Sequence, residues 1–404
     1  MRRVYLDYNA TTPLAPEVFQ AMEPYLNGEF GNASSIHAWG QLAKAAVEEA
    51  RDSVARLLGA RASEVIFTSG GTESNNLAIF GVVEAASAPR SVKHIVTTAI
   101  EHHAVLYPVK ALERQGVRAT YVSVGASGMV DPRDIERAIT PETVLISVMH
   151  ANNELGAIQP IEEIGQIARE RGIVFHTDAV QSVGKIPVNA AALGVHLLSL
   201  SAHKLCGPKG VGALYVRKGT PLRPLMYGGH HERDRRPGTE NVPGIVGLGR
   251  AAELALDHGR EEAARVGSLR DRLEAGILRA VPQVQVNSGA SLRLPTTSSI
   301  SFDAIDGEGF VIAMDLRGIA CSTGAACSSG SLEPSHVLSA IGKNREQARS
   351  TIRFSLGRAT TCEDVDYTLE VLPPLVKHLR SLSPRYKEAV SDQPSTVSIP
   401  NWAG

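Results

Sequence analysis

The sequence predicts an α/β fold in which a large unit has a mostly parallel sheet flanked by helices and a smaller α/β unit follows it. From about residue 64 to residue 216, short apolar runs rich in Val, Ile and Thr alternate with helix-like segments. Past a glycine-rich segment at residues 227–244, helical patterns and strands occur again. A chain of 404 residues with 43% hydrophobic residues is long enough for two or three domains.

The strands of the large unit are expected at its short apolar runs. Amphipathic stretches at residues 104–115 and 161–171 predict helices between them, because a glycine suited to a helix C-cap closely follows each. This alternation implies right-handed crossovers, and ligands then collect at the carboxyl ends of the strands. The expected strands are residues 65–67, 94–97, 120–124, 144–149, 174–176, 197–200 and 212–216.

The smaller unit is expected to hold helices through Leu256 and Ile277, with strands at residues 297–302 and 351–355. The tail at residues 391–404 is polar, contains two prolines and is expected to be flexible. No internal repeat is visible.

Charge and hydropathy narrow the class of partner and the location. The formal net charge is −1, which gives no electrostatic reason to expect a nucleic acid or an anionic membrane as partner. Small metabolites or proteins are the expected partners. The two early arginines are not followed by an apolar signal region, and no later stretch has the length of a membrane span. A cytoplasmic location is therefore expected.

The chain has four cysteines, at positions 206, 321, 327 and 362. They form no CxxC pair and have no metal-ligand spacing with histidine, so neither a zinc site nor a disulfide scaffold is indicated. Cys321 is expected in a strand and Cys362 at a helix start, and one of the four thiols could still be reactive.

A glycine turn follows the first expected strand of the large unit. Gly70-Gly71-Thr72 precedes a helix that is expected to start near Glu73. Free backbone N–H groups and the positive end of the helix would point at an anion such as phosphate. A tight connection without a ligand is the commoner role of such a turn.

Asp178 and Lys204 follow two further strands. A carboxylate at position 178 can keep the pyridine nitrogen of pyridoxal phosphate protonated, or it can cap a helix. A lysine amine in a partly desolvated pocket forms an imine with an aldehyde, although most lysines are solvated surface groups. His102 could lie on the cofactor ring or handle protons, or it could be a packed or capping residue. These residue types occurring together favour a pyridoxal-phosphate site.

A run of small residues from Cys321 to Pro334 carries Cys327 ahead of a helix expected near Pro334. This composition favours a mobile surface loop. A thiol on such a loop is accessible, and a nearby cation would raise its thiolate fraction.

With these motifs in order, the sequence resembles the NifS/IscS-like cysteine desulfurases of the class-V aminotransferase family, and the resemblance extends over nearly the whole chain. It implies a homodimer of the type I pyridoxal-phosphate fold that converts L-cysteine to L-alanine and leaves a persulfide on Cys327. The matching runs are residues 5–13, 67–75, 101–102, 150–154, 176–181, 201–204, 324–327, 332–335 and 352–358.

The resemblance also implies roles for single residues. Lys204 would hold the cofactor as a Schiff base, Asp178 would pair with the pyridinium, and His102 would stack on the ring. Arg353 would clamp the substrate carboxylate, which suits a planar guanidinium. Further contacts are implied for Gln181 and Asn153 with a cofactor oxygen or the substrate, for Thr72, Ser201 and His203 (beside Gly71 of the glycine turn) with the phosphate, and for Thr239 with the phosphate of the neighbouring subunit.

The resemblance sets further expectations. Residues 15–257 are expected to form the large cofactor-binding domain, and residues 1–14 with 258–404 the small domain that carries the thiol loop. The sulfur is expected to reach an acceptor protein, such as an iron–sulfur scaffold or another thio-cofactor route. Cys327 could also be a transient ligand of an iron–sulfur cluster, although no fixed metal site is expected.

Alternatives remain open at this point. Selenocysteine lyase or another pyridoxal-phosphate reaction is compatible with the same fold. A non-catalytic sulfur-transfer scaffold is a third alternative, against which the intact Lys204, Asp178 and Cys327 argue. Two departures from the family pattern stand out: Cys206, for which inert packing is favoured, and the tail after Ala389, which does not match the family's scaffold-docking end.

Overall fold

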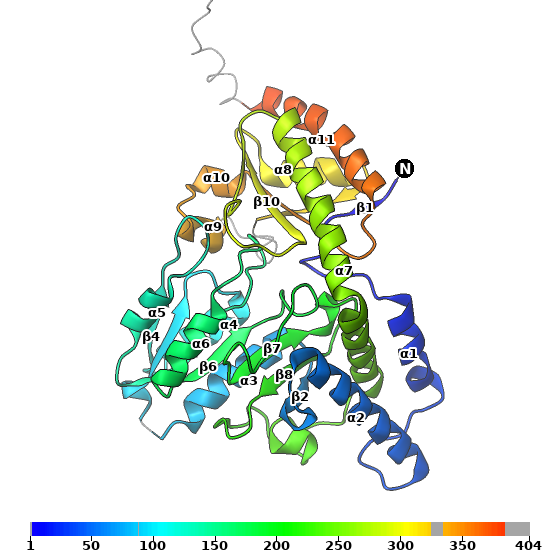
Figure 1. The fold of residues 1–404 in the computed structure, drawn as a ribbon, viewed down its shortest axis with the longest axis vertical. Helices are drawn as coiled ribbons and strands as arrows, with labels where there is room; N and C mark the ends of the chain where they lie inside the picture. Colours follow the sequence, from blue (N-terminus) through cyan, green and yellow to red (C-terminus); the bar gives the residue numbers. More distant parts are fainter. Residues whose placement is uncertain (1, 88, 325–333, 384–404) are drawn as a thin grey trace, which may run out of the picture.

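The structure is a computed structural model that describes residues 2–87, 89–324 and 334–383. The tail at residues 391–404, expected to be flexible, lies outside these ranges. Three sheets, of seven, four and two strands, and the helices packed on them make up the two units in the described part of the chain (Figure 1). In the part of the chain that the structure describes, no helix is long and apolar enough to cross a membrane.

The large unit contains a seven-stranded sheet of order β2-β8-β7-β6-β5-β3-β4. Its strands are parallel except β8, which pairs antiparallel with both β7 and β2. The sheet is therefore mostly parallel, as predicted. Its strands are β2 (Val65–Thr68), β3 (His94–Thr98), β4 (Arg118–Val122), β5 (Thr143–Ser147), β6 (Val174–Asp178), β7 (Leu197–Ser201) and β8 (Gly212–Val216).

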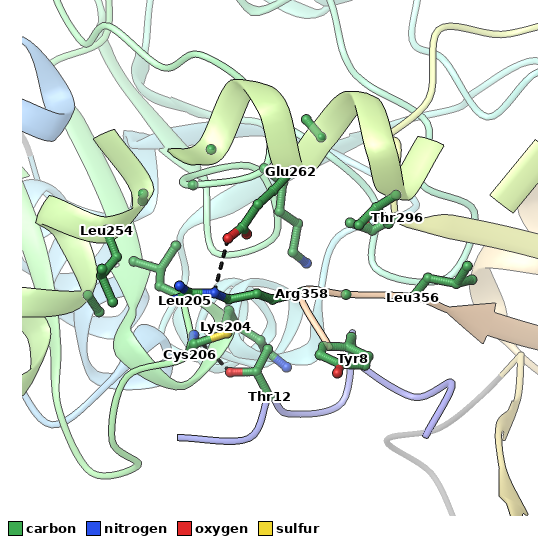
Figure 2. Close-up of a pocket in the computed structure, with 18 residues that line it drawn as sticks. Tyr8, Thr12, Lys204, Leu205, Cys206, Leu254, Glu262, Thr296, Leu356 and Arg358 are labelled. Atoms are coloured by element: carbon green, nitrogen blue, oxygen red, sulfur yellow. Dashed lines mark hydrogen bonds and ion pairs between the residues drawn. The ribbon is translucent and has the colours of Figure 1, made fainter. Parts of the chain in front are cut away.

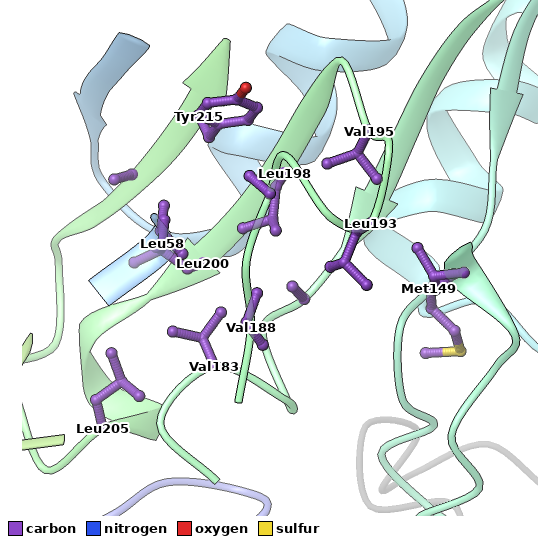
Figure 3. Close-up of a cluster of buried hydrophobic side chains, with 14 of the residues drawn as sticks. Leu58, Met149, Val183, Val188, Leu193, Val195, Leu198, Leu200, Leu205 and Tyr215 are labelled. Atoms are coloured by element: carbon purple, nitrogen blue, oxygen red, sulfur yellow. The ribbon is translucent and has the colours of Figure 1, made fainter. Parts of the chain in front are cut away.

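Helices cover both faces of this sheet because neighbouring strand residues point to opposite sides. Ile66 packs with α3 and α4 on one face, whereas Val65 and Phe67 pack with α2 and α7 on the other. Figure 3 shows part of this second cluster, in which Leu58, Leu198, Leu200 and Tyr215 lie together. The helices are α1 (Pro16–Asn27), α2 (Ala38–Leu58), α3 (Gly71–Ala85), α4 (His103–Glu113), α5 (Pro132–Ala138), α6 (Ile161–Glu170) and α7 (Val242–Ala280).

The smaller unit is built on a four-stranded sheet of order β12-β13-β10-β9, with its own buried cluster around Phe302, Phe310 and Phe354. The first strand of the chain, β1, pairs in parallel with β11 and so joins this unit. Its elements are β1 (Val4–Tyr5), β9 (Val284–Val286), β10 (Thr297–Phe302), α8 (Gly307–Asp315), β11 (Ile319–Ala320), β12 (Ser322–Thr323), α9 (His336–Ala340), α10 (Arg345–Arg349), β13 (Thr351–Ser355) and α11 (Cys362–Leu382).

Helix α7 runs along both units. It packs against α1 and α2 near its start and against α11 near its end, as Figure 1 shows. Leu248 belongs to the core of the large unit, and Leu273 belongs to that of the smaller unit. The two helical patterns expected at Leu256 and Ile277 are thus one continuous helix. The division at residues 257 and 258 falls inside it and stays a prediction.

Candidate active site

A cavity of about 370 Å³ opens at the carboxyl ends of the parallel strands. Several elements contribute one or two side chains each, because parallel strands end at a common edge. Of the predicted site residues, this cavity collects Gly71, Thr72, His102, Asn153, Asp178, Gln181, Ser201, His203, Lys204 and Arg353. Thr239 lines a separate cavity together with Ser34 and His231, and Cys327 lies outside the described residues.

The glycine turn forms one wall of the cavity. Gly70 has φ +152°, which favours glycine, and α3 starts at Gly71, two residues earlier than expected. A Cβ atom on Gly71 would lie 2.6 Å from Val180 Cγ2. The absence of a side chain therefore lets the turn pack closely against Val180, and the N–H groups of the first turn of α3, which have no acceptor within the helix, suit an anion.

Asp178 ends β6 and is 6% exposed. Asn75 Nδ2 donates to its Oδ2 at 2.7 Å, and the Val180 backbone N–H donates to its Oδ1 at 3.0 Å. A turn, not a helix, follows Asp178, so the helix N-cap alternative is wrong. A buried carboxylate held in this way presents an acceptor to a protonated ring nitrogen.

Lys204 ends a short 3₁₀ turn, Ala202–Lys204, directly after β7. Its Nζ donates to the backbone oxygens of Asn9 at 2.5 Å and Ala10 at 2.7 Å. The N-terminal segment therefore reaches the end of the lysine side chain. These carbonyl oxygens hold the amine in the cavity that Asp178 and His102 also line.

His102 is the N-cap of α4, and its Nδ1 accepts a hydrogen bond from the Ala104 backbone N–H at 3.1 Å. It both caps the helix and lines the cavity. Burial lowers the pKa of His102, and the charges of His103 and Lys204 add to this while Asp178 opposes it. Since Nδ1 is an acceptor, the proton of the neutral ring sits on Nε2.

Arg353 comes from β13 of the smaller unit and is 1% exposed. Its Nη2 donates to Asp7 Oδ1 at 2.7 Å, and its Nη1 donates to the Asn153 backbone oxygen at 3.1 Å. Among the described residues, its Nε has no hydrogen-bond partner although it is buried. A buried guanidinium with a free donor has the chemistry to bind a carboxylate.

Asn9 was missed as a site residue. Its backbone oxygen accepts from Lys204 and from Gln181 Nε2, and its side chain donates to the Asn153 backbone oxygen at 3.0 Å. Asn75, which lines the cavity and donates to Asp178, was also missed. Asn9 and Asn75 lie in motifs that carry the resemblance, and this resemblance could have indicated them as site residues. The position of residues at strand ends could not have indicated Asn9, because it does not predict that an N-terminal segment lies beside the sheet.

The three cysteines in the described part of the chain do not line this cavity. Cys206 lines a smaller cavity next to Lys204, where Figure 2 shows it beside Thr12. Burial raises the pKa of the Cys206 thiol, in keeping with a packing role. Cys321 is buried but lies between β11 and β12, so its assignment to a strand is wrong, whereas Cys362 does begin α11. The same small cavity holds the ion pair of Arg358 and Glu262 at 3.1 Å.

The lining fits pyridoxal phosphate. The glycine turn offers backbone donors for a phosphate, Asp178 offers a buried acceptor for the ring nitrogen, and the Lys204 amine lies in the same cavity for the aldehyde. Among the described residues, no group of three or more His, Cys, Asp or Glu side chains could hold a metal ion.

Comparison with known proteins identifies the class. The model of the aminotransferase class-V family matches residues 4–368, so fold and site are those of a pyridoxal-phosphate-dependent enzyme. Cysteine desulfurase IscS of Dictyoglomus turgidum is 53% identical over 387 residues, which cover 96% of this chain and 98% of that protein. Cysteine desulfurase IscS of Methanosarcina thermophila is 50% identical over 384 residues, covering 95% and 94%. The chain belongs to the NifS/IscS-like cysteine desulfurases of the class-V aminotransferase family.

Solved structures agree with this assignment. A NifS-like protein superposes with a TM-score of 0.88 at 39% identity, covering 94% of this chain and 100% of that one. SspA in complex with cysteine has a TM-score of 0.79 at 40% identity, covering 89% and 100%.

Proposed function

We propose that this enzyme takes the sulfur atom from L-cysteine, releases L-alanine and keeps the sulfur as a persulfide on Cys327. The observation that carries the proposal is the convergence of Lys204, Asp178, His102 and Arg353 on one cavity. The relatives named cysteine desulfurase and the structure of SspA in complex with cysteine support this substrate.

The chain's own groups divide the work. Pyridoxal phosphate, when bound, supplies an electron-withdrawing ring that stabilises negative charge on the carbon beside the amino group. Arg353 binds the substrate carboxylate through its guanidinium, which lines the cavity, and so orients the amino group toward Lys204. The Lys204 amine takes the proton from the α-carbon and returns it. The Asp178 carboxylate, held by Asn75, would accept a hydrogen bond from the ring nitrogen.

The sulfur step balances without another reagent. The Cys327 thiolate attacks the substrate sulfur and forms a sulfur–sulfur bond, while the carbon–sulfur bond breaks. Its electron pair stays on the carbon, which takes up a proton and becomes the methyl group of alanine. The sulfur leaves as a persulfide, which a thiol of an acceptor can later collect.

Replacement of two cysteines tests this proposal. Cys327→Ser is expected to keep the visible absorbance of the cofactor bound to Lys204 but to lose alanine formation from L-cysteine. Cys362→Ser is the matched control, because this thiol is exposed at the start of α11, away from the cavity, and should leave alanine formation unchanged. Alanine formation by Cys327→Ser at the wild-type rate would remove Cys327 from the reaction.

We further propose a homodimer in which Thr239 approaches the cofactor phosphate of the partner subunit. Thr239 is exposed and does not line the cavity that holds Lys204 of its own chain. Met226 and Tyr227, earlier in the same connection between β8 and α7, are 45% and 86% exposed, which is typical of an apolar contact with a second chain.

The fate of the sulfur and the cellular location complete the proposal. We propose a cytoplasmic enzyme that passes sulfur to an acceptor protein such as an iron–sulfur scaffold, as the name IscS of its relatives suggests. Transient ligation of a cluster by Cys327 belongs to the same proposal. Incubation of a cell extract with the enzyme and sulfur-labelled cysteine identifies the acceptor, and label that stays on the enzyme alone would contradict transfer.

A further inference from the structure

Lys185 lies beneath the cofactor cavity in a tight turn after β6. Its backbone N–H donates to the Ser182 backbone oxygen at 3.0 Å, and the preceding Gly184 has φ +77°. A Cβ atom on Gly184 would overlap Leu205, so the turn depends on glycine there. This turn directs the lysine back under Gln181, which lines the cavity.

The Lys185 ammonium has two side-chain partners. Its Nζ donates to Gln181 Oε1 at 2.6 Å and to Asn9 Oδ1 at 3.3 Å. An ammonium can only donate, so it selects the oxygen end of the Gln181 amide. The Nε2 end of Gln181 is then left to donate, and it does so to the Asn9 backbone oxygen at 2.9 Å. Lys204 Nζ donates to this same oxygen at 2.5 Å.

The positive charge of Lys185 is buried close to other titratable groups. The titratable groups that interact with its charge are Lys204, Arg353, Cys206 and His203, and none of these four is a carboxylate. Burial lowers the pKa of Lys185 to about 7, and the charges of Lys204 and Arg353 add to this. Glu262, in the smaller cavity that Lys185 also lines, is paired with Arg358.

We propose that Lys185 is a positioning residue of the cofactor site: it turns the N–H end of the Gln181 amide toward the cavity, and its charge opposes a positive charge on the Lys204 nitrogen. The inference deepens the proposed function, because it rests on Lys204 as the point of cofactor attachment. Gln181 would then meet the cofactor as a donor, which suits an anionic oxygen. Lys185 itself touches neither substrate nor cofactor.

The pH at which the visible absorbance of the Lys204-bound cofactor changes tests the inference without any substrate. Lys185→Met removes the charge and the amide contact, and Lys185→Gln removes the charge but keeps a donor. Both are expected to raise the midpoint of the absorbance change by about one pH unit, because loss of a like charge favours the protonated nitrogen. Lys185→Arg keeps the positive charge at every pH, so its midpoint should lie at or below the wild-type midpoint.

Lys218→Met is the matched control, since Lys218 is exposed after β8, and its midpoint should not move. The unfolding temperatures of the cofactor-loaded variants show whether a substitution also weakens packing, independently of the absorbance midpoint. If the absorbance band of Lys185→Met and Lys185→Gln is intact and their midpoints equal that of the wild type, the inference is overturned. The proposed function would not be affected by this outcome. Persistence of the wild-type absorbance band in the Lys204→Ala variant would overturn the proposed attachment and the inference with it.

Discussion

Two buried glutamates lie beside the site and respond to pH. Glu101 is fully buried, and its Oε1 accepts from Thr98 Oγ1 at 2.7 Å and from the Met149 backbone N–H at 2.9 Å. Burial raises the pKa of Glu101 to about 8, with a further contribution from the Asp178 charge. Glu154 accepts from Ser335 Oγ at 2.5 Å, and burial raises its pKa to about 7. Both carboxyls favour the protonated form when the chain is folded.

Glu101→Gln is expected to stabilise the enzyme at alkaline pH. The folded pKa lies above the ordinary glutamate value of 4.5, so the contribution of protonated Glu101 is full below about pH 4.5 and is lost as pH rises through about 8. Glutamine keeps the acceptor for Thr98 and Met149 but cannot ionise. The variant should gain at least about 1 kcal/mol over the wild type at about pH 8, and little at about pH 4.5.

Thermal unfolding of the loaded enzyme and variant over this pH range measures the difference. Since both proteins carry the same cofactor, its own titration cancels in the comparison. A constant difference between the two unfolding temperatures at every pH would show that Glu101 does not titrate in the folded chain.

Much of the site could be predicted at the residue scale, because residues such as Asp178 and Lys204 follow recognisable strands and the sheet topology brings strand ends together. Asn9 and Lys185 could not be found in this way. Asn9 reaches the site only because β1 joins the smaller unit, and Lys185 only because a glycine turn folds back under Gln181. Both contacts depend on long-range packing that no local pattern records.

Among the elements, two helices show how close packing limits substitution. In α6, a Cβ atom on Gly165 would overlap the Leu193 backbone oxygen, so the helix approaches the following connection at backbone distance. In α7, a Cβ atom on Gly267 would lie 3.5 Å from Pro295 Cβ, an ordinary contact. The same amino acid therefore has a packing role in one helix and none in the other.

Alanine at these two positions is expected to have opposite effects on the free energy of unfolding. Gly165→Ala should lower it by about 1–3 kcal/mol, because the backbone of residue 193 cannot move away cheaply. Gly267→Ala should raise it by up to about 1 kcal/mol, because alanine restricts the unfolded chain and favours helix. Denaturant unfolding checks both, and destabilisation by Gly267→Ala would show that α7 is packed more tightly than its contacts indicate.

Element boundaries were predictable where apolar runs are buried. The strands β8, β10 and β13 have the predicted limits. The strand expected at residues 120–124 lies instead at Arg118–Val122, at the edge of the sheet. An edge strand is only partly covered, so its first residue can be an exposed arginine. A prediction based on apolar runs then places the start of the strand too late.

At the scale of the whole molecule, the connection that carries Thr239 is fixed to the body of the large unit. Arg51 donates from Nη1 and Nη2 to the two carboxylate oxygens of Glu232, both at 2.8 Å, and both side chains are buried. Glu232 also accepts from the Phe67 backbone N–H at 2.8 Å. This paired contact fixes the connection to the sheet, as the proposed contact of Thr239 with a second chain requires.

Mixing two inactive variants tests the proposed dimer. Lys204→Ala lacks the attachment point, and Thr239→Asp places a carboxylate against the partner's cofactor phosphate, so each alone should be inactive. After subunit exchange, mixed dimers contain one site in which Lys204 and Thr239 are both intact. About a quarter of all sites should then be active, because half of the dimers are mixed.

Alanine formation from L-cysteine is the readout, and each variant mixed with itself is the control. Recovery of no activity after proven exchange would contradict a site shared between two chains. Activity of Thr239→Asp alone would contradict the contact with the phosphate.

The N-terminal segment has a consequence for synthesis in the cell. The Leu6 backbone N–H donates to Ala320, the Ser355 backbone N–H donates to Leu6, and Asn9 then supplies the oxygen that Lys204 contacts. During translation, the first residues of the chain must wait for residue 355 to leave the ribosome before they can take this position. The cofactor pocket is therefore completed only after β13 has emerged, so loading with pyridoxal phosphate is expected to follow synthesis of that strand.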